Sequence, residues 1–346
     1  MTEEAGMNAN QLTQQLLHRV NASWIAQAVY AAVELGLPER LAHGPRAVAD
    51  LAGECHVPVY TLERLLRALI TVDVFVQNPD GTFALTETGR RLCADHPESI
   101  RSWVIWWTSN LAYAWAELLY SIRTGKSART LVHGVEGFEH LDQNPEQAAV
   151  FNQALLELTR LTAVSIAGHY DFSSFRCVMD VGGGYGELLR VILQNNPRTR
   201  GILFDRAHAL GGALERFQQE GLAERCEFLE GNFFEEVPPG ADAMVLKSII
   251  HDWPDEKAAL ILANCRKAMP AAGKLLVIGR IMPARLESTD EHRDMVRSDL
   301  TMLVALGAGE RSEDQYRVLL ENAGFDVGRT VSVGMGHSMI EASPRP

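Results

Sequence analysis

Apolar residues recur at helical spacing through the first half of the chain. From Leu12 to Leu37 they form one continuous pattern that Gly36 and Pro38 end, so we expect a helix there. Shorter helices are predicted at 47–52, 58–72 and 86–92. Residues 75–85 predict two short strands around a Pro-Asp-Gly turn. Two helices followed by a small hairpin are the outline of a winged helix.

The second half changes to near-continuous apolar runs that alternate with helical patterns. The runs cover 177–181, 201–204, 226–229, 241–246 and 274–281. The helical patterns that follow them cover 187–194, 209–220, 255–269 and 312–323. Runs buried on both faces, with helices between them, predict a parallel, doubly wound α/β sheet. The boundary between the halves is expected near 165–176, where a Gly- and Ser-containing stretch breaks a long helix.

Composition supports a globular protein and argues against nucleic acid as a partner. Of 346 residues, 47% are hydrophobic and 22% charged, which excludes wholesale disorder. Lys and Arg total 32 against 44 Asp and Glu, a formal charge of −12 that repels phosphate backbones. No apolar run is long enough to cross a bilayer, and the acidic, polar start does not look like a signal peptide. We therefore expect a soluble, cytoplasmic protein without a membrane partner.

The cysteines indicate neither a disulfide framework nor a zinc site. There are five, an odd number, and they are far apart without a CxxC pair, which fits a reducing cytosol. His208, His292 and His337 have no partner at metal-ligand spacing, and no acidic cluster resembles a Mg²⁺ site. The sequence therefore predicts no metal.

A glycine-rich loop follows the first run of the second half, in Val178-Met-Asp-Val-Gly-Gly-Gly-Tyr-Gly, and a helical pattern begins directly after it. Glycines between strand and helix let a ligand approach the bare backbone and the helix N–H groups. The spacing is GxGxG, which suits a nucleoside with an amino-acid tail better than a pyrophosphate. Asp205 ends the next strand, where an acid accepts hydrogen bonds from ribose hydroxyls. The alternative is a tight strand–helix connection without a ligand.

With these residues and the block Val245-Leu-Lys-Ser-Ile-Ile-His-Asp-Trp-Pro-Asp-Glu-Lys, the chain resembles the class I S-adenosylmethionine-dependent methyltransferases. More narrowly, it is similar to the metal-independent small-molecule O-methyltransferases of plant phenolic, acetylserotonin and bacterial antibiotic-tailoring pathways. The similarity runs from about Trp24 to Met339, with supporting blocks at Glu230-Gly-Asn-Phe-Phe, Gly309-Glu-Arg-Ser and Gly137-Phe-Glu-His-Leu.

The resemblance implies a domain organisation and a set of site residues. Residues 1–100 would form a winged-helix dimerisation domain, 101–168 a helical linker that contributes to the substrate pocket, and 169–346 a Rossmann-like catalytic domain. The chain would form a homodimer and use S-adenosylmethionine, releasing S-adenosylhomocysteine. The implied cofactor-binding residues are Asp180, Gly182, Gly183, Gly184, Gly186, Asp205, Asn232, Phe233 and Lys247.

The same resemblance implies that His251 is the general base, with Asp252 adjacent and Glu310 orienting the imidazole. A histidine is well matched to removing a proton from a phenol, provided that a carboxylate fixes its tautomer. Part of the block around His251 also reads as an ordinary helix start. Two positions depart from the family pattern: Asn232 stands where Asp is usual, and Gly279 where many members carry a Glu beside the catalytic His.

Candidate substrate contacts are aromatic and apolar residues on predicted helices, with one amide and one acid among them. Aromatic residues at helical spacing more often belong to a core, although part of such a stripe can form the flat apolar wall of an aromatic pocket. Asp299 is expected either to orient His251 in place of Glu310 or to pair with an arginine such as Arg297. The candidates are Trp103, Trp107, Phe151, Asn152, Asp299, Met302 and Leu303.

Three functions remain open at this point. The first is O-methylation of a small phenolic or polyketide-like aromatic in secondary metabolism such as antibiotic biosynthesis. The second keeps the cofactor but catalyses a decarboxylation, hydroxylation or pericyclic reaction, for which Gly279 leaves room. The third is a winged-helix DNA-binding ligand sensor, with Arg64 and Arg67 on its recognition helix. Residues 1–165 hold 12 Lys and Arg against 18 Asp and Glu, which disfavours the third.

Overall fold

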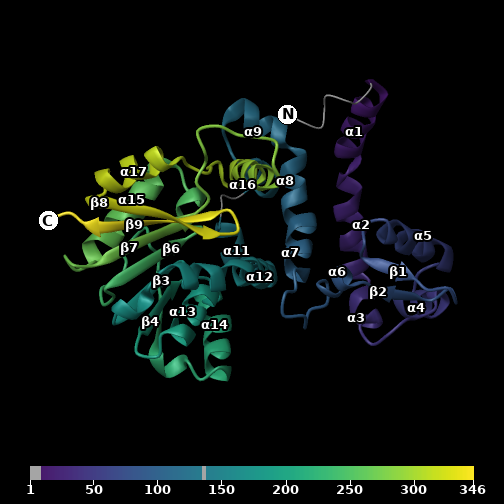
Figure 1. Ribbon diagram of the computed structural model, residues 1–346, viewed down its shortest axis with the longest axis horizontal. Helices are drawn as coiled ribbons and strands as arrows, with labels where there is room; N and C mark the ends of the chain where they lie inside the picture. Colours follow the sequence, from purple (N-terminus) through teal and green to yellow (C-terminus); the bar gives the residue numbers. More distant parts are fainter. Residues whose placement is uncertain (1–8, 135–137) are drawn as a thin grey trace. The chain divides into compact units, whose positions relative to one another are not determined.

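The computed structural model describes residues 9–134 and 138–346. It divides into two compact units, Met1–Ser109 and Asn110–Pro346. The first, here called the N-terminal unit, is largely helical, and the second, the C-terminal unit, contains the large sheet (Figure 1). The fold class predicted from the sequence is confirmed. Gly137, which opens one of the blocks quoted above, lies outside the described residues.

The N-terminal unit is a helical domain with a small hairpin. The hairpin strands are antiparallel, with Phe75 opposite Leu85. Buried side chains such as Leu62, Leu66 and Phe83 join the helices and the hairpin into one core. The elements are α1 (Ala9–Asn21), α2 (Ser23–Glu34), α3 (Leu37–Leu41), α4 (Val48–Cys55), α5 (Val59–Ile70), β1 (Phe75–Gln77), β2 (Phe83–Leu85), α6 (Glu87–Arg90) and α7 (Arg101–Trp106). The succession of α4, α5 and the hairpin is the one predicted.

The long N-terminal helix predicted from Leu12 to Leu37 is wrong in one respect, because it is interrupted at Ala22. The residues on either side of this break are Asn21 and Ser23, whose side chains favour helix ends over helix interiors. Gly36 ends the second segment as expected, in the left-handed conformation with φ of 63°.

The C-terminal unit alternates strands and helices after an initial helical stretch. Its helices are η2 (Trp107–Leu111), which begins before the boundary, α8 (Ala112–Ala116), α9 (Leu118–Thr124), α10 (Ala128–His133), α11 (Glu139–Gln143), α12 (Pro145–His169), η3 (Phe172–Ser174), α13 (Glu187–Asn195), α14 (Ala207–Gln219), η4 (Ala223–Arg225), η5 (Ile250–Asp252), α15 (Asp255–Ala268), α16 (Asp290–Leu306) and α17 (Glu313–Asn322). Its strands are β3 (Cys177–Val181), β4 (Arg200–Asp205), β5 (Cys226–Glu230), β6 (Ala243–Lys247), β7 (Lys274–Gly279), β8 (Phe325–Gly334) and β9 (His337–Pro344).

The seven strands form one sheet in the order β5-β4-β3-β6-β7-β9-β8. The pairs from β5 to β7 are parallel, so their carboxyl ends share one edge of the sheet. The chain changes direction between β3 and β6, and open α/β sheets bind ligands in the crevice at such a switch point. The antiparallel hairpin of β8 and β9, which the sequence analysis did not identify, completes the sheet beside β7.

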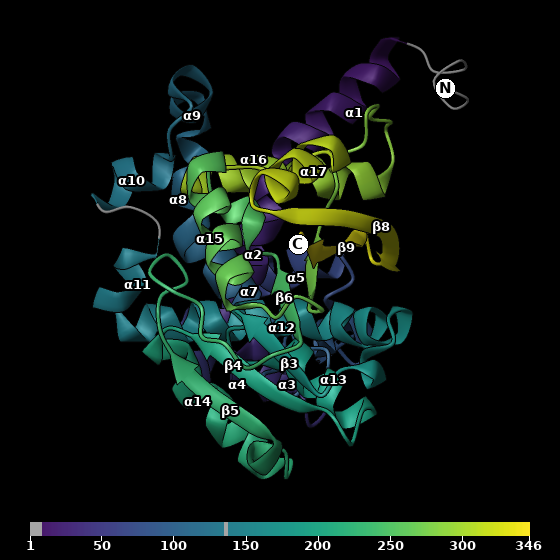
Figure 2. The same cartoon turned by 90° about the vertical axis from the view of Figure 1, so that its left-hand side faces the viewer.

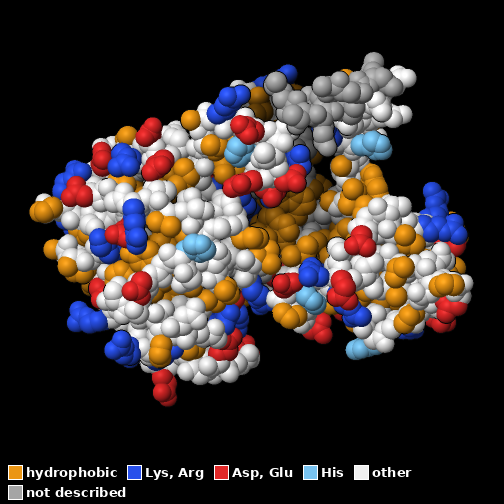
Figure 3. Space-filling view, in the orientation of Figure 1, with side chains coloured by type: hydrophobic (Ala, Val, Ile, Leu, Met, Phe, Trp, Pro, Cys, Tyr) orange, Lys and Arg blue, Asp and Glu red, His pale blue; other side chains and the backbone are white. Residues whose placement is uncertain are grey.

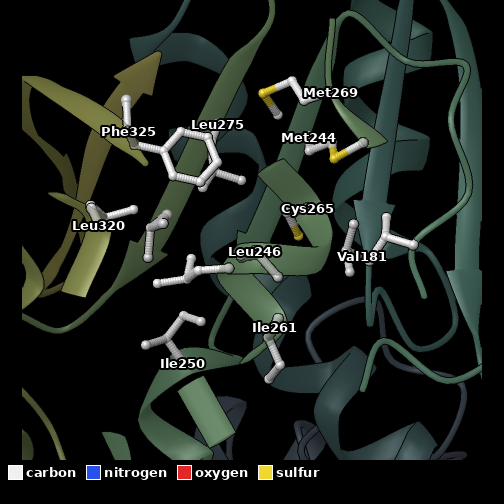
Figure 4. Close-up of a cluster of buried hydrophobic side chains, with 14 of the residues drawn as sticks. Val181, Met244, Leu246, Ile250, Ile261, Cys265, Met269, Leu275, Leu320 and Phe325 are labelled. Carbon is white, nitrogen blue, oxygen red and sulfur yellow. The ribbon is translucent and has the colours of Figure 1, made fainter. Parts of the chain in front are cut away.

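Alternate residues of each strand face opposite layers of helices. On one face, side chains such as Val181, Leu246 and Leu275 pack against α15 and α17, and Figure 4 shows them in one cluster with Cys265 and Leu320. The other face packs against α12, α13 and α14. Figures 1 and 2 show α13 and α14 on one side of the sheet and α15 and α17 on the other. This three-layer packing holds the carboxyl edge of the sheet in place.

Two surface properties bear on possible partners. Within residues 9–134 and 138–346, no helix has the length and apolar character needed to span a membrane. On the visible face of the C-terminal unit, acidic and basic side chains are interspersed, without a continuous basic patch (Figure 3).

Candidate active site

The glycine-rich loop after β3 is built from left-handed turns. Gly182, Gly184 and Gly186 have φ of 73°, 59° and 73°, a conformation that side chains rarely tolerate. The Gly182 N–H donates to the carbonyl of Phe204, 2.8 Å away, which ties the loop to β4. The loop therefore requires glycine for its backbone shape as well as for space.

The space around the loop differs from one glycine to the next. A Cβ atom on Gly183 would lie 2.6 Å from the Asp180 carboxyl carbon and from a Leu203 methyl. A Cβ on Gly184 would meet no atom within 4 Å, so the loop leaves bare backbone beside open space at this point. This is the cradle that a nucleoside with an amino-acid tail needs, and the residues fit such a group.

Asp205 ends β4 beside the loop, as predicted. Its Oδ2 accepts a hydrogen bond from the Gly184 N–H at 2.7 Å, and its Oδ1 accepts one from the Arg206 N–H at 2.6 Å. Burial raises the pKa of Asp205 above its ordinary value, and the two backbone donors offset only part of that rise. Each carboxylate oxygen keeps further acceptor capacity, which suits hydrogen bonds from a pair of ribose hydroxyls.

Asp180, which is buried, and Lys247, which is half-buried, lie near the ends of β3 and β6 and attract each other electrostatically. Asp180 is 3% exposed, and burial raises its pKa to about 7 despite the attraction of Lys247. Burial likewise lowers the pKa of Lys247 to about 8, and Asp180 opposes that change. The Lys247 ammonium donates to the hydroxyl of Thr159 on α12 at 2.9 Å. Both groups therefore lie where a polar ligand at the switch point would find a donor and an acceptor.

Asn232 and Phe233 follow β5. The Asn232 side-chain oxygen accepts from the Phe234 N–H at 3.0 Å, so it shapes this turn. The Phe233 ring lies 3.4 Å from where a Gly182 Cβ would be and packs edge to face with Phe234. Asn264 on α15 donates to the carbonyls of both phenylalanines, at 2.9 and 3.1 Å, an anchor that the sequence analysis missed.

The predicted catalytic residues are brought together. The Nδ1 atom of His251 lies 2.8 Å from Glu310 Oε1, and its Nε2 atom lies 3.4 Å from Asp252 Oδ1. Ser298 on α16 donates to the same Glu310 oxygen at 2.7 Å. Ser248 lies three positions before His251 and has φ of 56°, an unusual value for a residue with a side chain. A strained turn at the end of β6 thus presents the histidine to the carboxyl edge of the sheet.

The electrostatics of this cluster favour a charged histidine in the free protein. Burial would lower the pKa of His251, but Glu310 and Asp252 together raise it to about 9. Burial would raise the pKa of Glu310, but His251 and Ser298 lower it below its ordinary value. Burial raises the pKa of Asp252 to about 6, against the opposing effect of His251. At neutral pH the pair is therefore an imidazolium bonded to the Glu310 carboxylate.

Two further residues beside His251 were not singled out from the sequence. The hydroxyl of Tyr316 lies 3.6 Å from where a Cβ on Gly279 would be, so a buried phenol stands over the position at which the resemblance implies a Glu. Arg311 donates to the carbonyls of Ile250 and Trp253 on either side of the histidine, at 2.8 and 2.7 Å. Neither contact has a local sequence signal, because the partners lie far apart in the chain.

The candidate substrate residues have varied surroundings. In the N-terminal unit, the rings of Trp103 and Trp107 pack 5.5 Å apart. In the C-terminal unit, Phe151 packs against Phe138, whose ring also meets Trp253. Met302 and Leu303 are half-buried on α16.

The two polar candidates make contacts that the sequence did not anticipate. Asn152 is 3% exposed and lies 2.9 Å from Nδ1 of His208, at the start of α14 beside Asp205. Asp299 accepts a hydrogen bond from the Glu310 N–H at 2.8 Å, so it holds the backbone of the residue that contacts His251. On the same helix, Arg297 lies 3.5 Å from Asp294.

No group of three or more His, Cys, Asp or Glu residues in the described part of the chain has the arrangement of a metal site. The polar groups around His251 are Glu310, which is hydrogen-bonded to the imidazole and to the Ser298 hydroxyl, and Asp252, which lies 3.4 Å from Nε2. Their arrangement suits proton transfer at the imidazole.

Two family models match the chain. An O-methyltransferase domain covers residues 115–326, and an O-methyltransferase dimerisation domain covers residues 17–95. The first therefore contains the glycine loop, His251 and Glu310, and the second contains most of the N-terminal unit.

Curated relatives match over nearly the full length. The chain is 36% identical to the phenazine O-methyltransferase PhzM of Lysobacter antibioticus over 344 residues, covering 99% of this chain and 100% of that protein. It is 38% identical to the O-demethylpuromycin-O-methyltransferase of Streptomyces alboniger, covering 90% and 84%. It is 35% identical to the 3-amino-4-hydroxybenzoate 4-O-methyltransferase of Streptomyces cremeus, covering 96% and 90%.

Solved structures agree with these relatives. The crystal structure of LaPhzM matches with a TM-score of 0.93 and 36% identity, covering 96% of this chain and 99% of that one. The O-methyltransferase NcsB1 from neocarzinostatin biosynthesis, solved with S-adenosylmethionine and 2-hydroxy-5-methyl naphthoic acid, matches with a TM-score of 0.79 and 31% identity, covering 92% and 96%. With the loop, the paired His251 and Glu310 and the N-terminal helical domain, these matches show that the chain belongs to the O-methyltransferase family and is an S-adenosylmethionine-dependent enzyme.

Proposed function

We propose that this enzyme methylates a hydroxyl group of a small aromatic natural product, with His251 as the general base. The observation that carries the proposal is the 2.8 Å contact between His251 Nδ1 and the fully buried Glu310 carboxylate. A carboxylate on Nδ1 holds the proton there in the neutral imidazole, which leaves Nε2 as the basic atom. A hydroxyl within hydrogen-bond reach of Nε2 would lose its proton as the new bond to the methyl group forms.

When bound, S-adenosylmethionine supplies an electrophilic sulfonium methyl group. We propose that the bare backbone of the loop at Gly182, Gly183, Gly184 and Gly186 receives the methionine and ribose portion. Asp205 would accept the ribose hydroxyls, Phe233 and Asn232 would face the adenine, and Asp180 with Lys247 would line the nucleoside side. The support is the open space over Gly184 and the free acceptor capacity of Asp205.

The acceptor is proposed to be a phenol or a comparable ring hydroxyl. Relatives are named as O-methyltransferases of phenazines, of 3-amino-4-hydroxybenzoate and of a dihydroxynaphthoate, which are aromatic compounds, and as a mitomycin biosynthesis 6-O-methyltransferase. The aromatic group of Phe138, Phe151 and Trp253 in the C-terminal unit offers apolar ring faces of the kind such a substrate needs. We include Trp103, Trp107, Met302 and Leu303 as candidate contacts.

Two contacts refine the roles of the polar candidates. We propose that Asp299 acts through Glu310, because it bonds to the Glu310 N–H. Asn152 is bonded to His208 near the ribose end of the site, so we propose that it supports the cofactor side of the pocket.

We also propose a cytosolic homodimer formed through the N-terminal domain. Residues 17–95 match a dimerisation domain, and α1 exposes a stripe of large apolar side chains. All five cysteines are free, which fits a reducing compartment. We keep the three domain ranges predicted from the sequence, which are 1–100, 101–168 and 169–346. The structure itself divides into two compact units.

The test is methyl-group transfer to a panel of acceptors. Wild type, His251→Ala and Val318→Ala, a variant at an exposed position of α17, are incubated with methyl-labelled S-adenosylmethionine and a panel that includes 3-amino-4-hydroxybenzoate and hydroxylated phenazines. We expect a product one labelled methyl group heavier, formed about 10²- to 10⁴-fold more slowly by His251→Ala and unchanged in Val318→Ala. Mass spectrometry detects the added methyl group, and NMR of the product distinguishes methylation at oxygen from methylation at nitrogen, because the two isomers have the same mass.

Each other outcome has a definite meaning. Full activity in His251→Ala would remove the general-base role and leave methyl transfer intact. Cofactor binding by calorimetry, combined with consumption of a panel compound without methylation, would support the alternative of a non-methylating reaction for which Gly279 leaves room. Failure to bind the cofactor would contradict the assignment of the glycine loop.

A further inference from the structure

The turn that carries His251 has little support from its own backbone. η5 is three residues long, Ile250–Asp252. Its internal hydrogen bonds run from the Asp252 N–H to the Ile249 carbonyl at 3.1 Å and from the Trp253 N–H to the Ile250 carbonyl at 3.3 Å. A single short turn with only these two backbone hydrogen bonds does not by itself fix a side chain to the accuracy that proton transfer demands.

Arg311 supplies the missing support from the opposite side of the site. Its Nη1 donates to the Ile250 carbonyl at 2.8 Å, and its Nη2 donates to the Trp253 carbonyl at 2.7 Å. These two carbonyls bracket His251 and Asp252 in the sequence. The planar guanidinium therefore joins the two ends of the turn as a rigid fork, which a lysine cannot reproduce.

The arginine is itself firmly held. It is 6% exposed, and its own carbonyl accepts from the Met282 N–H at 2.9 Å, in a parallel bridge that extends β7. Asp255 at the start of α15 accepts from Nε at 3.0 Å and from Nη2 at 2.8 Å. The charge of the buried guanidinium is thus balanced, and four hydrogen bonds fix its plane.

Glu310 and Arg311 are neighbours in the chain, yet they hold different parts of the same histidine. Glu310 contacts the imidazole ring, while Arg311 contacts the backbone on either side of it. Since one segment carries both residues, a movement that displaced the His251 turn would have to break the ring contact and the backbone contacts together.

We propose that Arg311 is a positioning residue for His251, whose clamp on the Ile250 and Trp253 carbonyls keeps the imidazole in register with Glu310 and directs Nε2 toward the acceptor hydroxyl. This rests on the proposed role of His251 as general base. Displacement of a reacting group by about 1 Å can cost about 10²-fold in rate, which sets the size of the expected effect.

The experiment compares Arg311→Met and Arg311→Lys with a matched control, Arg225→Met. Arg225 also donates to several backbone carbonyls, but at the amino ends of the strands. Loss of either arginine should lower the melting temperature, whereas only loss of Arg311 should change kcat and the titration of His251. Each variant is assayed for kcat and KM with the best acceptor of the panel, for S-adenosylhomocysteine binding by calorimetry, and for the titration of ¹⁵N-labelled His251 by NMR.

We expect Arg311→Met to lower kcat about 10²-fold and Arg311→Lys to lower it about 10-fold, with unchanged KM for S-adenosylmethionine. The midpoint of the His251 titration should fall from about 9 toward its ordinary value of 6.5 in both, because the ring loses its register with Glu310. Arg225→Met should lose stability while keeping the wild-type kcat and titration. If Arg311→Met does not fold, the same measurements on Arg311→Lys test the positioning role of Arg311.

A wild-type kcat and His251 titration in Arg311→Lys and in any folded Arg311→Met would overturn the proposal, as would an equal kcat loss in Arg225→Met. The titration is read without substrate, so it tests the clamp even if no panel compound is methylated. Full activity in His251→Ala would instead remove the general-base role, and Arg311 would then have no histidine function to support. Inactivity of His251→Ala beside fully active Arg311 variants would overturn the positioning role alone.

Discussion

The two carboxylates beside His251 act on different atoms of its ring. Glu310 lies 2.8 Å from Nδ1 and its side chain is fully buried, so it fixes both the tautomer and the plane of the ring. Asp252 lies 3.4 Å from Nε2, beyond a good hydrogen bond, so it adds negative potential without occupying the basic atom. This difference lets one carboxylate orient the base while the other leaves it open to an acceptor.

The raised pKa of His251 predicts how the reaction depends on pH. A general base must be neutral, and the pKa of His251 is raised to about 9 by Glu310 and Asp252 against the effect of burial. We expect kcat/KM to increase as pH rises toward about 9. In Glu310→Gln the charge that raises the pKa is removed, so the midpoint should fall, and the maximal rate should drop about 10²-fold or more as the ring loses its orientation. A pH–rate profile of both proteins measures the two effects.

The control for this profile is Ser298→Ala, which removes one hydrogen bond to Glu310 and keeps its charge. Its midpoint should stay close to that of the wild type. A Glu310→Gln profile with an unmoved midpoint would show that a group other than His251 governs the pH dependence.

The contact between His251 and Glu310 also stabilises the folded protein, within a defined pH window. The folded-state pKa of His251 lies above its ordinary value of 6.5, so its contribution is complete below that value and is lost as pH rises through about 9. The pKa of Glu310 lies below its ordinary value of 4.5, so its contribution is present above 4.5 and is lost as pH falls below that. The pair is therefore at full strength between about pH 4.5 and 6.5 and weakens on either side.

At the scale of elements, the close packing around the β3–α13 loop predicts the effect of a substitution at Gly183. A Cβ on Gly183 would lie 2.6 Å from Asp180 and from Leu203, both rigidly packed. Gly183→Ala should therefore displace the Asp180 carboxyl, weaken S-adenosylhomocysteine binding more than 10-fold, and lower the free energy of unfolding by about 1–3 kcal/mol. Calorimetry and denaturant unfolding measure the two effects.

Gly211→Ala is the matched control for this substitution. Gly211 lies inside α14, and a Cβ there would meet no atom within 4 Å. Alanine in place of glycine within a helix should raise the free energy of unfolding by about 0.5–1 kcal/mol and leave cofactor binding unchanged. Wild-type affinity in Gly183→Ala would contradict the account of the loop.

The sequence predicts elements and contacts whose signals are local. The glycine loop, Asp205 and the strand before His251 follow from period, turn chemistry and spacing within short segments, and the structure contains them. The clamp by Arg311 and the anchor by Asn264 join segments distant in the chain, so only the packed fold shows them. The β8–β9 hairpin was missed for a related reason, because exposed positions and a register shift interrupt the alternation that identifies a strand.

At the scale of the whole molecule, the N-terminal unit exposes apolar surface that a monomer would leave in water. Leu12, Leu16 and Val20 are 44%, 61% and 67% exposed. They follow one another at four-residue spacing along α1, and so they share one face of the helix. Contiguous apolar surface of this kind marks an interaction site, and residues 17–95 match a dimerisation domain.

The exposed stripe of α1 also predicts how the chain assembles. If the α1 stripe lies in the dimer interface, Leu16→Glu combined with Val20→Glu would bury two unpaired carboxylates, a cost of several kcal/mol that favours dissociation. We expect light scattering to give twice the chain mass of 38.2 kDa for the wild type and 38.2 kDa for the double variant. Val318→Glu, an equally exposed position on α17, adds a charge outside the stripe and should leave the dimer intact. A monomeric wild type would refute the homodimer, whereas a dimeric double variant would place the interface elsewhere on the N-terminal unit.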